Sequence, residues 1–439
     1  MIRSFALAAT VPDVPLILLA PFAVLLLLMA AMPLMPGRAR HAWEANYGWV
    51  SLGLAAAVAG YYLLKMPGGS ALVAHTLRDY ASFIALIGAL FVVAGGVHLH
   101  VNNEATCREN VLFLFAGALL ANVIGTTGAS VVLIRPWIRM NQTRISGYHV
   151  VFFIFLVSNV GGALTPIGDP PLFLGYLRGV PFFWLVQHVW AQWLATVGLI
   201  LLVFYVIVRR DFRRTPAPVR SDAVRHRSGF RVDGWANAGL LGVIVLAVFL
   251  PPRFFFRELV MLGAAAISLM ATPRAIHRQN HFTFAPIREV AVLFAGIFVT
   301  MMPALNYLEA HGGRLGFSKP AHYYYATGGI SAVLDNAPAY LNLLELAEST
   351  FAPDAGAGAE RSQRGVAALM AGQPSVIVAI SLGAVFFGAM TYIGNGPNFM
   401  VRSIAESAGV RCPGFIGYVV KYSLPILLPI IALTAWLFL

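Results

Sequence analysis

Two segments that repeat each other decide the fold of this chain. Residues 162–173 read Gly162-Ala163-Leu164-Thr165-Pro166-Ile167-Gly168-Asp169-Pro170-Pro171-Leu172-Phe173, and residues 388–399 read Gly388-Ala389-Met390-Thr391-Tyr392-Ile393-Gly394-Asn395-Gly396-Pro397-Asn398-Phe399. Seven of the twelve aligned positions are identical, at an offset of 226. Glycine and proline interrupt both segments, and a helix cannot close all of its hydrogen bonds across them. The sequence therefore predicts an internal duplication with one broken helix in each copy.

A second pair of segments repeats as well. Residues 126–133 align with residues 327–334 at an offset of 201, with five of eight positions identical. The two offsets differ by the length of a polar, Ala/Gly-rich insertion over 349–373, so one inserted loop explains both alignments. The surrounding apolar regions, 109–137 and 317–347, carry glycine-rich breaks around Gly125–Gly128 and Thr327–Gly329. Because each break leaves arms too short to cross a bilayer, we predict two re-entrant hairpins, shielded by protein or by a water cavity.

The composition identifies the class of protein. The chain has 439 residues, of which 59% are hydrophobic and only 11% are charged. An ordinary soluble domain carries about 25% charged residues. The mean hydropathy of +0.76 therefore excludes a soluble globular protein and a disordered chain. It also argues against a nucleic-acid partner despite the net charge of +12, because the basic residues lie between apolar blocks. Two cysteines are too few for a disulfide framework. The sequence predicts a multi-pass membrane protein.

The apolar stretches divide into two similar halves. We expect an all-α integral membrane protein in which residues 1–208 form the first repeat, 209–234 a basic linker and 235–439 the second repeat. The expected spans are 14–34, 47–65, 80–99, an interrupted one over 148–178, 184–208, 235–252, 257–272, 288–308, an interrupted one over 375–410, and 413–438. The first of them could instead be a signal peptide. Five crossings in each half make the second copy enter from the opposite side, so the repeats are inverted.

The arginines set the expected orientation. The linker is the longest polar segment and is rich in arginine, which favours the cytoplasm for that segment. Threading the spans outward from it places both termini on the outside. We read the linker as a solvated connection between the halves, with contact to anionic lipid as the alternative.

Polar residues surround the two breaks and the two hairpins. They are Ser158, Asn159, Thr165 and Asp169 near the first break, Thr391, Asn395 and Asn398 near the second, and Thr126, Thr127, Ser130 and Ser331 in the hairpins. Hydroxyl, amide and carboxylate oxygens are hard donors that suit an alkali cation. The alternative is that these side chains only cap the ends of broken helices. Inverted repeats with paired broken helices are typical of secondary transporters, and their binding site lies between the breaks.

Two acids carry the functional hypothesis. Asp169 lies in the first break, and Asp335 lies in the second hairpin, followed by Asn336. An ionisable residue at membrane depth is costly and indicates function. In the repeat alignment, Asp169 is aligned with Asn395, and Asp335 is aligned with Ile134. The other copy therefore has no acid at either position, so the symmetry of the repeats requires neither acid. A buried carboxylate can exchange a proton for a cation, and we expect Asp169 and Asp335 to bind Na⁺.

Arg135 closes the first hairpin. It could be an interfacial side chain that reaches toward water. The alternatives are an ion pair with one of the carboxylates and a contact with an anionic substrate.

These motifs resemble a known group of proteins. Ser158-Asn159-Val160-Gly161-Gly162, running into Thr165-Pro166-Ile167-Gly168-Asp169-Pro170-Pro171, resembles the first signature of the ion transporter superfamily. This superfamily includes D-type bacterial sodium/proton antiporters, arsenite exporters, citrate/metal carriers and dicarboxylate carriers. Ile330-Ser331-Ala332-Val333-Leu334-Asp335-Asn336-Ala337-Pro338 is similar to the second-hairpin motif of the antiporters.

The resemblance covers nearly the whole chain, and it is strongest to a bacterial branch described either as sodium/proton antiporters or as putative citrate transporters. It implies a homodimeric scaffold against which a transport domain moves. It also implies a site built from Ser158, Asn159, Thr165 and Asp169 on one side and Asp335, Asn336, Thr391 and Asn395 on the other. One departure matters. Dicarboxylate carriers repeat a Ser-Asn-Thr triplet, whereas this chain has Ser158-Asn159-Val160 and Gly394-Asn395-Gly396, which does not favour their mode of carboxylate binding.

The expected function is secondary active transport by alternating access. We expect sodium/proton antiport in the inner membrane of a bacterium, with Na⁺ and H⁺ as partners and no enzymatic activity, cofactor or nucleic acid. The alternative is cation-coupled transport of citrate or another carboxylate, for which Arg135 and the half-helix N-termini would bind the anion. A channel or the membrane subunit of an enzyme would need a ring of pore-lining residues or cofactor ligands, and the sequence presents neither pattern.

Overall fold

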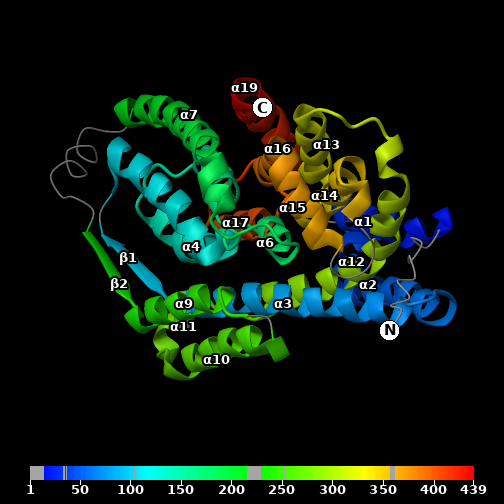
Figure 1. The fold of residues 1–439 in the computed structure, drawn as a ribbon. Helices are drawn as coiled ribbons and strands as arrows, with labels where there is room; N and C mark the ends of the chain where they lie inside the picture. The colour runs from blue at the N-terminus through cyan, green and yellow to red at the C-terminus, as the bar shows by residue number, and fades with distance from the viewer. Residues whose placement is uncertain are drawn as a thin grey trace.

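The computed structural model describes residues 14–32, 35, 37–102, 104–214, 229–251, 253–355 and 361–439. Seven helices in this part are long and apolar enough to cross a membrane, or eight if the bent pair at Arg361–Gly372 and Pro374–Met390 is one span. Two shorter apolar helical segments, Leu16–Ala31 and Trp235–Val248, accompany them. The structure therefore confirms an all-α integral membrane protein (Figure 1).

One layer of the molecule is built from helices of both halves of the chain. It contains α2 (Arg38–Lys65), α3 (Gly69–Gly95), α9 (Trp235–Val248), α10 (Phe256–Ala271) and α12 (Ala285–His311), which lie together along one side in Figure 1. We call it the α3 layer. Phe83 of α3 stacks on Phe294 of α12 with ring centroids 4.9 Å apart, and the Tyr80 hydroxyl donates to the carbonyl of Ala291 at 2.8 Å. The short helices α1 (Ala20–Ala31) and α11 (Arg274–Gln279) complete this region.

The first re-entrant hairpin is present. Helix α4 (Cys107–Arg139) turns back at Gly125, whose φ of 77° and ψ of 154° are not helical. The two arms lie side by side, because the amides of Asn110 and Asn141 donate to each other at 2.8 Å and Phe113 stacks on Trp137. A straight helix would place residues 110 and 141 roughly 45 Å apart. The second arm therefore brings the chain back to the end of the molecule where the first arm began, although the segment is long and apolar enough to cross a membrane.

Both predicted broken helices are present, and their breaks have the same backbone. The first consists of α5 (Gly147–Leu156), a 3-10 turn at Val160–Leu164 and α6 (Pro170–Leu177). The second consists of α16 (Pro374–Phe387), a 3-10 turn at Gly388–Met390 and α17 (Gly396–Ser407). Thr165 and Thr391 both end the turn in an extended conformation, and Asp169 and Asn395 both begin the next helix. The sequence alignment of the two breaks is therefore correct.

The second hairpin turns at a different place from the one expected. Its arms are α13 (Pro320–Val333) and α14 (Asn336–Phe351), and the break lies at Leu334–Asp335. The expected break at Thr327–Gly329 was wrong, because these residues lie within α13. Gly328 serves close packing instead. A Cβ atom there would lie 2.5 Å from the ring of Phe387 on α16, so the glycine lets the two helices approach.

Two matching hydrogen bonds correct the register of the hairpins. The Thr165 hydroxyl donates to the carbonyl of Asn122 at 2.6 Å, and the Thr391 hydroxyl donates to that of Ala332 at 2.7 Å. These bonds make Ala332 the counterpart of Asn122. The sequence alignment of the hairpins placed Tyr323 over Asn122 instead, so that alignment was wrong.

The corrected register changes two expectations. The counterpart of Asp335 is Gly125, not Ile134. In the corrected register, the segment between hairpin and broken helix is still longer in the second half than in the first. The difference is smaller than the length of the expected insertion over 349–373. Part of that segment forms α15 (Arg361–Gly372).

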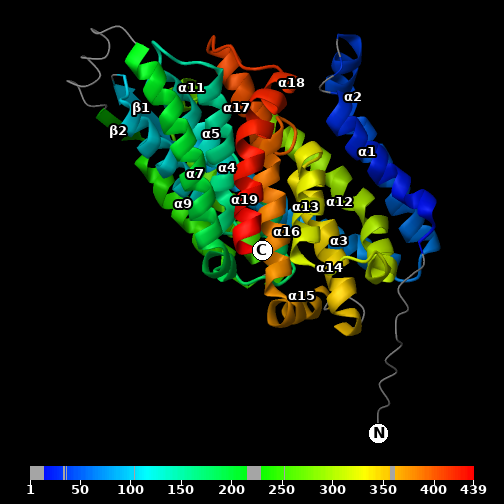
Figure 2. The ribbon, with the colours of Figure 1, turned by 90° about the horizontal axis from the view of Figure 1, so that it is seen from above.

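The remaining elements connect and cover the site. Helix α7 (Trp184–Arg214) includes the first residues of the expected linker, whereas Arg220, Arg225 and Arg227 lie outside the described residues. Strand β1 (His98–Asn102), where a span was expected to end, pairs with β2 (Gly229–Asp233) in an antiparallel ribbon. The chain ends in α18 (Phe415–Tyr418), a π-helix (Val419–Leu427) and α19 (Leu428–Phe438). The ribbon and α15 lie far apart in Figures 1 and 2.

Candidate functional site

Asp169 is the centre of the candidate site. Its side chain is 1% exposed and accepts three hydrogen bonds. The donors are the Thr126 hydroxyl at 2.8 Å, the Asn395 amide at 2.9 Å and the Asn336 amide at 2.5 Å. They come from the first hairpin, the second broken helix and the second hairpin. None of the ion pairs between described residues involves Asp169, so this buried carboxylate is held by neutral groups.

Other predicted residues form a second ring around this carboxylate. The Asn395 amide also contacts the carbonyl of Ser158 at 3.1 Å and Oδ1 of Asn159 at 3.2 Å. Asn159 in turn donates to Oδ1 of Asn398 at 2.7 Å. The hydroxyls of Ser158 and Ser130 are 2.8 Å apart. The structure therefore brings residues 126–130 against residues 158–169.

Three predicted hydroxyl groups point at the backbone. Thr165 and Thr391 donate to the hairpins as described above, and they accept from the amides of Gly168 and Gly394 at 3.1 Å. Ser331 donates to the carbonyl of Ala384 at 2.6 Å. These bonds fasten hairpins to broken helices, which agrees with the capping alternative for these residues.

Asp335 and Asn336 lie at the tip of the second hairpin. Asp335 is half-buried and caps α14 by accepting from the amide of Ala337 at 3.1 Å. Asn336 is fully buried, and its Oδ1 atom has no hydrogen-bond partner among the described residues. An acceptor oxygen without a donor is costly in an apolar interior. This oxygen belongs to the same side chain that binds Asp169, so the site has an unused ligand next to its carboxylate.

Arg135 lies away from the site. It follows Thr126 by nine residues on the returning arm of the first hairpin, about 13 Å along a helix. The charged residue near it is Arg139. Among the described residues, Arg135 forms no ion pair with Asp335 or with any other acid. The ion pair, one of the alternatives for Arg135, is therefore not formed among the described residues. Thr127 is half-buried and lines the cavity described next.

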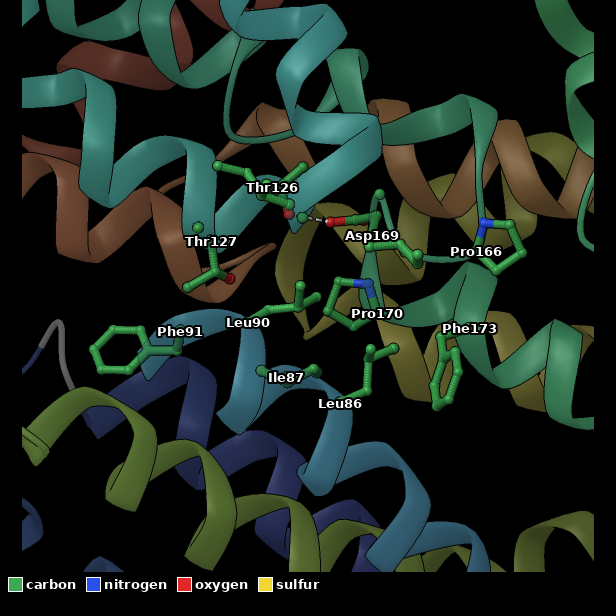
Figure 3. A pocket seen from close by; sticks show the side chains of 15 residues that line it. Leu86, Ile87, Leu90, Phe91, Thr126, Thr127, Pro166, Asp169, Pro170 and Phe173 are labelled. Carbon is green, nitrogen blue, oxygen red and sulfur yellow. Dashed lines mark hydrogen bonds between the residues drawn. The ribbon is translucent and has the colours of Figure 1, made fainter. Parts of the chain in front are cut away.

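A cavity connects the site with the α3 layer. It lies between α3, which contributes Leu86, Ile87, Leu90 and Phe91, and the tip of the first hairpin with the first break. Figure 3 shows Asp169, Thr126 and Thr127 on one side of it and the apolar α3 residues on the other. Its lining contains one carboxylate and no basic side chain. Such a lining suits a small cation, because an anion would meet a carboxylate without a compensating charge.

Asn122 was missed by the sequence analysis. Its side-chain amide donates to the carbonyl of Gly161 at 2.6 Å, and its Oδ1 atom accepts from the amide of Leu164 at 2.9 Å. It thereby holds the first hairpin against the first break. The available signal was a single amide within the apolar run 111–124, where a polar side chain needs a partner.

Comparisons with known proteins identify the family. Residues 11–439 match the model of a family described as "Putative citrate transport". Proteins described as uncharacterized transporters of Mycobacterium bovis and of Mycobacterium tuberculosis are each 24% identical over 320 residues, which cover 67% of this chain and 67% of the relative. The family match spans almost the whole chain, including both hairpins and both broken helices. The chain therefore belongs to the putative citrate transport family, and it is a membrane transport protein.

Proposed function

We propose that this protein exchanges Na⁺ for H⁺ by alternating access, with Asp169 as the residue that both ions share. The observation that carries the proposal is the buried Asp169 carboxylate, which is held by neutral donors beside the unpartnered Oδ1 of Asn336. A buried charge without a counter-ion is strongly unfavourable. The carboxylate therefore needs a proton or a bound cation.

The amides explain how one site can hold either ion. A carboxylate that binds Na⁺ needs further oxygens, and Asn336 offers Oδ1 without breaking another hydrogen bond. Thr126 and Asn395 keep the carboxylate in place while the ion changes. Na⁺ and a proton each neutralise the Asp169 carboxylate, so the site can move through an apolar interface at low cost with either ion bound. Asp335 lies next to Asn336 at the hairpin tip and adds negative charge that attracts the cation.

The proposal includes the expected architecture of the cycle. The halves 1–208 and 235–439 act as inverted repeats, and superposing them requires a two-fold axis in the membrane plane. The helices around Asp169 move against the α3 layer, whose face toward the site is apolar at Leu86, Ile87, Leu90 and Phe91. The protein works in the inner membrane of a bacterium as a homodimer, with the α3 layer in the scaffold.

Citrate transport is the second candidate, and the description of the family favours it. A carboxylate substrate would need a positive group or a bound cation beside it. The half-helix N-termini at Pro170 and Gly396 could supply part of that charge. Arg135 is a weak candidate because it lies about 13 Å along the helix from Thr126. The lining of the cavity, which has one carboxylate and no basic side chain, favours the cation.

Proteoliposomes with an imposed pH gradient separate the two candidates. We expect added Na⁺ to dissipate the gradient in the absence of any carboxylate, and we expect Asp169→Asn liposomes to show no response. Accumulation of labelled citrate, with no response to Na⁺ alone, would establish the second candidate instead.

A further inference from the structure

A second cavity lies between the same two helices, α3 and α6, as the cavity at Asp169. Its lining includes His75, Thr76 and Asp79 of α3 and Leu174, Leu177 and Arg178 of α6, with α12 and α14 completing the wall. The cavity at Asp169 is lined by Leu86–Phe91 of α3 and by residues up to Phe173 of α6. The two cavities therefore follow each other along both helices. We call the second one the outer cavity.

The helical rise gives the spacing between the cavities. Asp79 precedes Leu86 by seven residues, which is about 10 Å along α3. Arg178 follows Asp169 by nine residues, about 13 Å along α6. Between the cavities the space between the two helices is closed by Leu86, Phe173 and Leu174, whose side chains are 1–2% exposed. A thin apolar barrier therefore separates the outer cavity from the site.

The charges around the outer cavity leave one acid weakly paired. Arg178 binds Glu345 at 3.5 Å and Ser362 at 3.1 Å, and Arg257 binds Glu258 at 2.8 Å. Asp79 has only a loose contact with His75, whose Nδ1 atom is 3.4 Å away, and its side chain is 24% exposed.

Two further charged groups lie near Asp79 or near its neighbour Arg178. Arg78 lies over the ring of Phe255, and buried Glu348 keeps one oxygen without a partner among the described residues. The lining of the outer cavity holds one carboxylate, that of Asp79, together with Arg178 and His75, and none of the ion pairs between described residues joins Asp79 to an arginine.

We propose that the outer cavity is a docking site for a small monovalent cation on its way to Asp169, with Asp79 as the residue that holds it. The inference rests on the proposed cation transport. An acid at the mouth of a narrow, low-dielectric passage raises the local concentration of cations. The cation leaves Asp79 when Leu86 and the α6 residues move apart, and it then reaches the carboxylate of Asp169. Asp79 lies in the first half of α3, and the ribbon follows the end of that helix, so we place the docking site toward the side opposite the ribbon.

Thiol labelling tests whether the outer cavity opens to water. In a background with Cys107→Ser and Cys412→Ser, Thr76→Cys is treated with a membrane-impermeant thiol reagent in right-side-out and in inverted vesicles. We expect labelling in one vesicle orientation only, and slower labelling when Na⁺ is added. Ala89→Cys, which is buried on the same helix, is the matched control and should stay unlabelled. Absence of labelling at Thr76→Cys in both orientations would overturn the inference.

Asp79→Asn tests the role of the acid. We expect the half-saturating Na⁺ concentration to rise about tenfold when Na⁺ is offered on the side of the outer cavity, and to stay unchanged on the ribbon side. The maximal rate should stay within about twofold of the wild type, and Asp79→Glu should restore the affinity. Asp233→Asn is the matched control, because Asp233 also pairs with a histidine and is 28% exposed, but it lies in the ribbon.

The outcomes separate this inference from the proposed function. If the wild-type protein exchanges Na⁺ for H⁺ and Asp79→Asn has the same half-saturating Na⁺ concentration as the wild type, only the docking role is overturned. Equal losses on both sides, with a lower maximal rate, would assign Asp79 a structural role and would also overturn it. If the wild-type protein does not respond to Na⁺, the proposed function fails, and the docking role for a cation fails with it.

Discussion

The two hairpin tips occupy equivalent places in the fold but are built differently. The first turns at Gly125 with a backbone that essentially only glycine adopts. The second turns at Leu334 and Asp335, which are extended and need no glycine. Both are fastened by a threonine at the same position of the broken helix. The fastening is thus common to the halves, whereas the acids, Asp169 in one break and Asp335 at the other tip, are not. The shared bonds serve the architecture, and we propose that the unshared acids serve ion binding.

Moving the acid to the other half is the strongest test of this contrast. We expect Asp169→Asn to lower Na⁺-dependent proton movement at least about a hundredfold, because the ion-binding charge is lost. Asp169→Asn combined with Asn395→Asp should not restore it. A carboxylate at position 395 would face the carbonyl of Ser158 and Oδ1 of Asn159, which accept hydrogen bonds from the present amide. Rates are measured in proteoliposomes, with normal yield and elution volume as the folding control. Recovery in the double variant would mean that the halves are chemically interchangeable.

Asp335→Asn should have a smaller effect on binding. Removing a charge that attracts the ion without binding it should weaken Na⁺ binding about tenfold, which corresponds to the Coulomb energy of two charges about 10 Å apart at an effective dielectric constant near 20. In the wild type, the apparent Na⁺ affinity should fall as the pH is lowered, because protons compete for the same carboxylates. Isothermal titration with Na⁺ at several pH values measures both effects. An affinity that is independent of pH would remove proton competition from the mechanism.

A pair of glycine substitutions distinguishes the tips by stability. Gly125→Ala should lower the free energy of unfolding by about 1–3 kcal/mol, because alanine is strained at this backbone conformation. Gly329→Ala should leave it unchanged or raise it by up to about 1 kcal/mol, because Gly329 lies exposed within α13 with open space around it. Thermal unfolding in detergent reports the difference. A large loss of stability in Gly329→Ala would instead support a turn at Thr327–Gly329, as expected from the sequence.

The two threonine fastenings should give small and equal losses of stability. Thr165→Val and Thr391→Val each remove one hydroxyl that donates to a hairpin carbonyl. Each should destabilise the protein by about 1 kcal/mol, as measured by thermal unfolding. A clear inequality between the two variants would show that the fastening is not common to the halves.

Local sequence patterns predicted the parts of the fold that depend on local chemistry. Glycine and proline within residues 162–171 and 388–397 indicated the broken helices, and Gly125 indicated the first tip. The second tip was misplaced because Gly328 looks like a turn residue, although it serves packing against Phe387. Asp335, which caps α14, was the better signal for a helix start. The ribbon of β1 and β2 and both cavities depend on residues more than 80 positions apart, which no local pattern contains.

The composition of the α3 layer has a consequence for how the protein is made. Ser51, Tyr62, Tyr80 and Ser82 on α2 and α3 find their hydrogen-bond partners 176–244 residues later in the chain, on α10 and α12. During synthesis these helices enter the bilayer long before their partners exist, and their polar side chains meet lipid or the insertion machinery. The layer can close only after α12 has been translated through His311. The polar side chains of α2 and α3 therefore reach their final partners only after the second half has been inserted.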